Sequence, residues 1–241
     1  MQAIVRDARM LWNALFLRTD AYEEMRRDNN PFVEGLFILA ILGLLLGLAG
    51  TAGAALEWAA TPNLDELQAV LLRNLQLTPA WEQATQRYPA FEPLFRQIWN
   101  TAWEAAANAR PSPAGALTAM VVQPVSLVLG WLVYGLLAHL FARLLGGVGT
   151  LNQTLGTTAL AAAPQLINLV AALPFVVAAG VGVWTLLCRY MAIRTAHELS
   201  WSRAVWATVL PYLVLAVIAL LLGGAVAALA AMGLAAFAGG M

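Results

Sequence analysis

The sequence has very little charge and no lysine. Only 11% of its 241 residues are charged and 61% are hydrophobic, whereas soluble domains carry about 25% charged residues. All thirteen basic residues are arginines, and the net charge at pH 7 is zero. The chain therefore has no electrostatic basis for binding nucleic acid. Its composition indicates a protein of the lipid bilayer.

Side chains suited to catalysis are equally scarce. The single cysteine, Cys188, cannot form an intrachain disulfide. Proteolysis within a membrane would need paired aspartates, a serine–histidine pair or a His-Glu-x-x-His motif, and an ion pathway would need carboxylates in the spans. None of these is found at spanning depth. We therefore expect no catalytic residues, no metal site and no enzymatic activity.

His139 is the only ionisable side chain that falls deep in an apolar stretch away from its ends. A ligand to haem or to a chlorophyll-type pigment would need a second feature, and the other histidine, His197, falls in a polar loop. A hydrogen-bonded structural role is the simpler interpretation. No cofactor is expected, and His139 is a weak candidate for cofactor binding.

The longest uncharged stretch lies between Arg143 and Arg189, which have no Asp, Glu, Lys or Arg between them. As one helix rising about 1.5 Å per residue, it would be roughly twice as long as the bilayer core is thick. It must therefore fold back on itself. Leu173-Pro174 is the expected break, because proline cannot continue a helix without losing a hydrogen bond.

This stretch is predicted to form a helical hairpin with helices over 153–172 and 175–191. Pro164 falls inside the first helix, where neighbouring groups can satisfy the freed carbonyl. We place Pro174 at the outer membrane surface and Thr150 at the inner one. A re-entrant pair of helices that returns without crossing is the alternative.

Three further apolar runs predict spans at about 34–56, 117–142 and 204–229. With the hairpin they make an all-α fold: a polytopic membrane helical bundle of five transmembrane helices, covering residues 34–241. In the first span Gly43, Gly47 and Gly53 form a face of small residues, which lets helices approach closely in lipid. These glycines, with Pro164 and Pro174, are expected to shape helix packing; self-association is the alternative role for the glycine face.

Two segments are too polar to span. Residues 1–33 form a cytoplasmic N-terminal segment, with an amphipathic helix over 3–16 that either lies in the headgroup plane or packs on the inner end of the bundle. Residues 57–116 form an extracytoplasmic insertion of amphipathic helices, a small cap in which Thr78-Pro79 marks a helix start. The apolar faces of the cap rest on the bilayer, on each other or on a partner.

The orientation follows from the distribution of arginine. With the N-terminus in the cytoplasm, nine arginines lie on the inner side and four in the long outer insertion. Cytoplasmic loops are richer in basic residues, so this count favours an inner N-terminus and an outer C-terminus. The protein is expected in a membrane, with the bacterial cytoplasmic membrane as the best match.

Several short motifs carry a family resemblance. The connection before the last span reads Arg194-Thr195-Ala196-His197-Glu198-Leu199-Ser200, a glycine-rich turn precedes Leu151-Asn152-Gln153-Thr154-Leu155, and a further motif covers residues 18–24. Together with the mid-span proline, these resemble the Yip1 family, whose connection has the form Arg-Glu-Ala-His-Gly-Leu-Ser. The resemblance implies a five-span fold. Eukaryotic members are tied to vesicle traffic and small GTPases, whereas bacterial members have no settled activity.

Three functional hypotheses remain open. The first is a non-enzymatic scaffold or accessory subunit of a membrane assembly, with the lipid bilayer and other membrane subunits as partners and no small-molecule substrate identified. Its cytoplasmic partner-facing loop would present Arg194, His197, Glu198 and Arg203. The second is the membrane component of a transporter or exporter. The third is a cofactor-holding subunit of a photosynthetic or respiratory complex, with His139 as the ligand.

Overall fold

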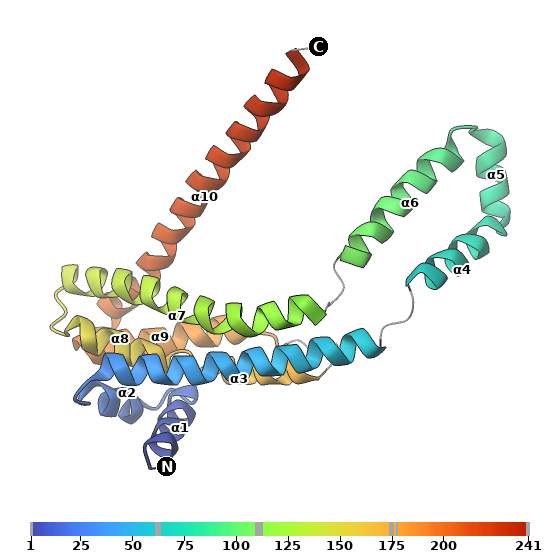
Figure 1. The fold of residues 1–241 in the computed structure, drawn as a ribbon. Helices are drawn as coiled ribbons and strands as arrows, with labels where there is room; N and C mark the ends of the chain where they lie inside the picture. Colours follow the sequence, from blue (N-terminus) through green and yellow to red (C-terminus); the bar gives the residue numbers. More distant parts are fainter. Residues whose placement is uncertain (1, 61–63, 109–112, 174–175, 177, 240–241) are drawn as a thin grey trace.

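The computed structural model describes residues 2–60, 64–108, 113–173, 176 and 178–239. Within these residues the chain is all-helical, with no strand, as predicted (Figure 1). In chain order the helices are α1 (Gln2–Leu15), α2 (Thr19–Arg26), α3 (Pro31–Ala60), α4 (Leu64–Gln76), α5 (Pro79–Arg87), α6 (Phe91–Asn108), α7 (Pro113–Leu144), α8 (Leu151–Leu160), the 3₁₀ helix η1 (Ala163–Ala172), α9 (Val181–His197) and α10 (Trp201–Gly239).

The described residues contain four helical segments that are long and apolar enough to cross a membrane. They are Pro31–Ala60, Leu117–Leu144, Leu151–Ala172 and Trp201–Ala228. The predicted count of five is therefore not matched. The fourth predicted span corresponds to α9, whose 17 residues extend about 25 Å, less than a bilayer core of about 30 Å. The chain is nonetheless a multi-pass integral membrane protein built as a helical bundle.

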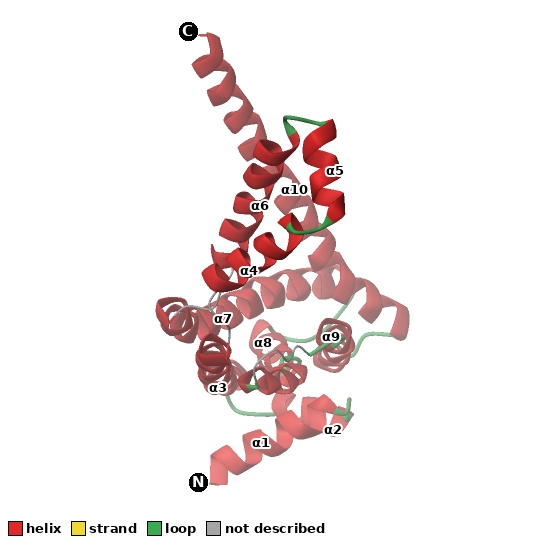
Figure 2. Ribbon diagram, turned by 90° about the vertical axis from the view of Figure 1, so that its right-hand side faces the viewer, coloured by secondary structure: helices red, strands yellow, loops and turns green. Residues whose placement is uncertain are grey.

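The bundle consists of α3, α7, the α8–η1 segment and α9, which run side by side (Figures 1 and 2). The connections from α2 to α3, from α7 to α8 and from α9 to α10 lie at one end of it, which we call the loop end. At the other end, which we call the cap end, α3 and α7 lead to the cap helices α4, α5 and α6. The cap extends well beyond the bundle.

Glycines on α3 set its distance from its neighbours. A Cβ added to Gly43 would lie 2.6 Å from Cα of Pro124 in α7, and one added to Gly47 would lie 3.0 Å from the carbonyl oxygen of Met120. Near the cap end, a Cβ on Gly53 would overlap the carbonyl of Ala171 in η1. Such backbone contacts between helices are possible only where the side chain is absent.

The first half of the hairpin was predicted as one continuous helix over 153–172, but the structure divides it into two helices. α8 ends at Leu160, a turn follows, and η1 begins at Ala163 with Pro164 as its second residue. Proline has no N–H, and its ring clashes with the carbonyl four residues earlier, which here belongs to Leu160. The helix therefore stops there and resumes as a tighter 3₁₀ helix.

The α8–η1 segment still runs the length of the bundle. Asn152 lies beside Phe32 at the loop end of α3, and Ala171 lies beside Gly53 toward its cap end. α9 then returns to the loop end, where the carbonyl of its last residue accepts a hydrogen bond from the loop after α7. The predicted turn at Pro174 and Phe175 lies outside the described residues.

The N-terminal segment packs on the bundle. The side chains of Met10, Ala14 and Tyr22 are buried in one apolar cluster with Leu160 of α8 and Cys188 of α9. The indole of Trp184 on α9 also donates a hydrogen bond to the carbonyl of Leu15, at 2.7 Å. The segment therefore packs on the bundle through the face of α1 that carries Met10 and Ala14. Trp12 and Phe16, which belong to the apolar face expected from the sequence, are exposed.

The cap is held together differently. Its helices contact one another, and none of the described residues of α5 or α6 is buried. Thr78 caps α5 as predicted, because its hydroxyl accepts a hydrogen bond from the Trp81 amide at 3.3 Å. A row of ring contacts runs along α5 and α6, made by Trp81, Phe91, Phe95, Trp99 and Trp103.

α10 leaves the bundle soon after it begins. Ala204, Ala207 and Thr208 are buried against α7 and α9, and the helix then diverges from every other helix drawn in Figure 1. Only 6% of the residues in its most apolar stretch are buried, against 28% to 50% for the other three spans. Most of α10 therefore has no partner within the described chain.

Candidate functional site

Side chains from three helices meet at the loop end. Thr154 of α8 lies at the centre, with His139 of α7 on one side and His197 of α9 on the other. Its Oγ1 lies 2.9 Å from Nδ1 of His139 and 2.8 Å from Nε2 of His197, and it donates to the carbonyl of Thr150 at 2.8 Å. The two imidazole centroids are 5.2 Å apart. We call these residues, with Asn152, Gln153, Arg26 and Glu198, the junction.

The hydrogen bonds of Thr154 define the tautomers of both histidines. A hydroxyl has one proton to donate and two lone pairs to accept with. Because the Thr154 proton goes to the Thr150 carbonyl, each lone pair accepts an N–H, from Nδ1 of His139 and from Nε2 of His197. Three helices are therefore joined through one oxygen atom.

The two residues before Thr154 anchor the ends of three helices. Asn152 Oδ1 accepts from the backbone N–H of Phe32 at 2.7 Å, in the first turn of α3. Gln153 and Thr150 form a reciprocal capping box at the start of α8, in which each side chain accepts the other's backbone N–H. Gln153 also donates from Nε2 to the carbonyl of Arg26, at 3.4 Å. The motif 151–155 thus fixes the positions of α2, α3 and α8.

Glycines make room for His197. A Cβ on Gly147 would lie 2.6 Å from Nδ1 of His197, and one on Gly149 would lie 2.3 Å from the carbonyl oxygen of Ala196. Nδ1 of His197 is buried and has no hydrogen-bond partner within the described chain. The glycine-rich turn after α7 is therefore required for close approach to the end of α9.

The surface of the junction carries an ion pair. Arg26 of α2 pairs with Glu198, which follows α9 directly. Glu198 has a left-handed backbone with φ of +55°, a conformation that favours glycine at the end of a helix. Arg194, Glu198 and Arg203 are exposed at the loop end, whereas His197 is only 1% exposed and points into the protein. Of the four residues predicted to face a partner, Arg194, Glu198 and Arg203 are therefore exposed and His197 is not.

A second polar feature lies inside the bundle around Arg189. Its guanidinium lies 4.0 Å from the ring centroid of Tyr134 on α7 and donates a hydrogen bond to the hydroxyl of Tyr212 on α10. It also lines a cavity of about 210 Å³ together with Ser126, Trp131, Thr158, Gln165 and Thr185. Arg189 is therefore directed at two tyrosine rings and a polar cavity between helices.

Sequence reasoning missed both arrangements. It placed His197 in a polar loop, because Arg194 and Thr195 lie just before it, and it treated Arg189 as the end of an uncharged run. The available signal was the four-residue spacing of His139 and Arg143 on α7, which puts both on one face, and of Thr154 on α8 and its N-cap Thr150. No group of three or more His, Cys, Asp or Glu side chains suited to a metal ion is found among the described residues.

The fold and the junction define the class of the protein: a multi-pass helical membrane protein in which polar side chains of three helices join at one end of the bundle. The Yip1 domain matches residues 12–224, and the chain belongs to the Yip1 family. The match contains every residue of the junction as well as the cap. Comparison with curated proteins and with solved structures finds no match.

Proposed function

We propose that the protein is a non-enzymatic scaffold or accessory subunit of a membrane assembly, and that α10 is the helix through which it binds other membrane subunits. The observation that carries this proposal is the separation of α10 from the bundle. Its apolar stretch is 6% buried, although the helix has 39 residues.

The composition of α10 supports a protein partner in addition to lipid. Added Cβ atoms on Gly223 and Gly224 would meet nothing within 4 Å, and alanines follow them along the helix. Helix association in lipid depends on close packing of small residues, because burial from water contributes no driving force there. A partner helix seated on this surface would gain the backbone contacts that Gly43 and Gly47 make inside the bundle.

Photo-crosslinking tests this role. A photoreactive residue at Leu221 of α10 is expected to form adducts with another membrane protein in native membranes, identified by mass spectrometry. The same residue at Leu136 of α7, which is also exposed, is the matched control and should react with lipid only. Adducts of equal yield at both positions, or a monodisperse monomer with no adduct at Leu221, would contradict the proposal.

The orientation is part of the same proposal, with the loop end in the cytoplasm of a bacterial cell. The exposed Arg194, Glu198 and Arg203 would then be open to a cytosolic partner. In a Cys188→Ala background, a cysteine at Ala172 should react with a membrane-impermeant thiol reagent added from outside. A cysteine at Thr150 should react only after the membrane is opened, and labelling of both from one side would refute the orientation.

A role as the membrane component of a transporter is the second candidate, because the Arg189 cavity supplies polar groups between the helices. An ionisable side chain at membrane depth is a pointer to function. If the cavity opens to water during transport, a cysteine at the buried Thr185 should become reactive toward a water-soluble thiol reagent. Complete protection of that cysteine under all conditions would argue against this candidate.

The cofactor-holding role has less support from the geometry. His139 and His197 do lie close together, but each donates a ring N–H to the same Thr154 hydroxyl. Ligation by those nitrogens would break both bonds. An absorbance spectrum of the purified protein, with or without a haem or pigment band, decides the question directly.

A further inference from the structure

An apolar cavity of about 540 Å³ lies between α1, α3 and η1. Its walls are almost entirely hydrocarbon and are lined by Leu11, Trp12, Ile38, Ile41, Leu42 and Leu169, among others. Trp12, Ile41 and Leu45 are all partly exposed at its rim, so the cavity is continuous with the surface that faces lipid. Its volume falls in the range of about 300–1,000 Å³ that small-molecule sites occupy.

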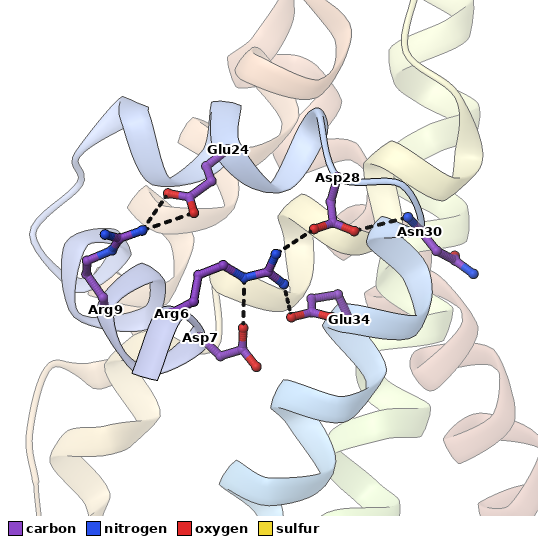
Figure 3. A network of polar contacts seen from close by, with 7 residues as sticks. All are labelled: Arg6, Asp7, Arg9, Glu24, Asp28, Asn30 and Glu34. Carbon is purple, nitrogen blue, oxygen red and sulfur yellow. Dashed lines mark hydrogen bonds and ion pairs between the residues drawn. The ribbon is translucent and has the colours of Figure 1, made fainter. Parts of the chain in front are cut away.

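One polar side chain lines this cavity, the carboxylate of Asp7. The Asp7 side chain is 8% exposed. Its Oδ1 receives Arg6 Nε at 3.4 Å, whereas Oδ2 is buried without a hydrogen-bond partner within the described chain. Figure 3 shows Oδ2 directed away from Arg6. A buried carboxylate oxygen without a partner is costly, and it points to a missing hydrogen-bond donor.

The charges around Asp7 do not balance. Among the described residues, Arg6 is the only cation paired with the carboxylates of Asp7, Asp28 and Glu34 (Figure 3). The neighbouring Arg9 is paired with Glu24 at 3.2 Å, and η1 contributes only Leu166 and Leu169 to this cavity. With all three carboxylates ionised, the cluster has an excess of two negative charges.

We propose that this cavity binds a membrane amphiphile that carries a primary ammonium group, with a hydrocarbon chain between α1, α3 and η1 and the ammonium donating to Oδ2 of Asp7. An ammonium group supplies both the missing donor and the missing positive charge, which a hydroxyl group would supply only in part. The chain enters from the lipid through the rim at Trp12. Two sources share this chemistry, an aminophospholipid and a single-chain alkyl amine.

The acid–base behaviour of Asp7 gives the binding a defined pH dependence. Burial, followed by the nearby Glu34 carboxylate, raises the pKa of Asp7 to about 6, against the smaller opposing effect of Arg6. Asp7 is therefore about half ionised near pH 6 and mostly ionised at neutral pH. A lipid ammonium stays protonated over this range, so its binding should strengthen from pH 5 to pH 7.5.

Native mass spectrometry of the full-length protein in detergent tests the proposal. The protein is equilibrated with phosphatidylethanolamine, with phosphatidylcholine of the same chains, or with a long-chain alkyl amine. Phosphatidylcholine is the matched control, because its quaternary ammonium has charge but no N–H. Retention of phosphatidylethanolamine or of the alkyl amine should exceed that of phosphatidylcholine by about tenfold, the effect of one charged hydrogen bond. The more strongly retained of the two identifies the source.

Three variants complete the test, each checked for an unchanged elution volume. Asp7→Asn should abolish the roughly tenfold preference and its pH dependence. Asp28→Asn removes the same charge from the same network but lies outside the cavity, and should keep the preference. Ala8→Phe should fill the cavity and reduce retention of both amines. Equal retention of all lipids by the unaltered protein, or an unchanged preference in Asp7→Asn, would overturn the proposal.

Discussion

The chain contains two sets of amphipathic helices that differ in how far they are buried. One set is α1 and α2 at the loop end, and the other is α4, α5 and α6 in the cap. Both sets carry apolar stripes on otherwise polar helices. On α1, Met10 and Ala14 pack with residues of α2, α8 and α9 and are at most 1% exposed, whereas Trp12 and Phe16 stay exposed. In the cap, neither α5 nor α6 has a buried residue. Amphipathicity alone therefore does not say whether a helix belongs to the core.

The difference lies in the side chains at the contacts between helices. The loop end supplies glycines, capping side chains and buried hydroxyls that let backbones meet. The cap supplies a row of aromatic rings that contact each other at centroid distances of about 5 Å. Substitutions should therefore be severe at the loop end and mild in the cap or in the free part of α10. Four predictions test this contrast, from the largest expected effect to the smallest.

The largest loss of stability is expected for Gly156→Ala in α8. A Cβ there would lie 2.3 Å from Cβ and 2.6 Å from the carbonyl oxygen of Pro31, at the start of α3. Because the backbone of Pro31 cannot shift without disturbing the start of α3, we expect the free energy of unfolding to fall by about 3 kcal/mol. Gly223→Ala is the matched control, because its Cβ would meet nothing within 4 Å and alanine favours a helix. Thermal unfolding in detergent should show a clear fall in the midpoint for the first variant and no fall for the second.

The second largest loss of stability is expected for Thr154→Val. Valine keeps the shape but leaves the N–H groups of His139 and His197 without an acceptor, which costs about 1–3 kcal/mol. Thr101→Val in the cap is the control, because its hydroxyl also donates to the carbonyl four residues earlier, at 2.9 Å, but in an exposed position. Its effect should stay within about 0.5 kcal/mol. Equal losses in the two variants would mean that the junction contributes no more than an ordinary helix surface.

The third effect concerns pH and Asp7. The folded protein raises the pKa of Asp7 to about 6 from an ordinary value of 3.8. Between these two values the folded state binds more protons at Asp7 than the unfolded state, so the contribution of Asp7 to stability is greatest at low pH and is lost as the pH rises through about 6. In delipidated protein, Asp7→Asn should remove this fall and gain on the order of 1 kcal/mol at pH 7.5. The exposed Glu104→Gln in the cap should leave the pH profile unchanged.

Much of the bundle was predictable from the sequence because it depends on local rules. The uncharged runs predict α3, α7 and α10, and Thr78-Pro79 predicts the start of α5. The break at Leu160 could have followed from Pro164, but a proline inside a span is often tolerated when neighbours satisfy its carbonyl. The residues of the junction could not be placed, because Thr154, His139 and His197 meet only through tertiary packing. Their partners lie 15 and 43 positions apart in the sequence.

The smallest change in stability is expected for substitution of Glu198, because two contributions of this residue to stability oppose each other. Its exposed ion pair with Arg26 contributes up to about 1 kcal/mol, whereas its left-handed backbone costs about 1 kcal/mol relative to glycine. Glu198→Gly should therefore change stability by less than about 0.5 kcal/mol at low salt. Because salt weakens the ion pair but not the backbone strain, the variant should become the more stable form as ionic strength rises. In the cap, Arg96→Gln breaks the Arg96–Glu92 pair without any backbone strain to relieve, so its small loss should only shrink with salt. A loss above about 1 kcal/mol for Glu198→Gly, independent of salt, would show that the residue stabilises the end of α9 through contacts other than this ion pair.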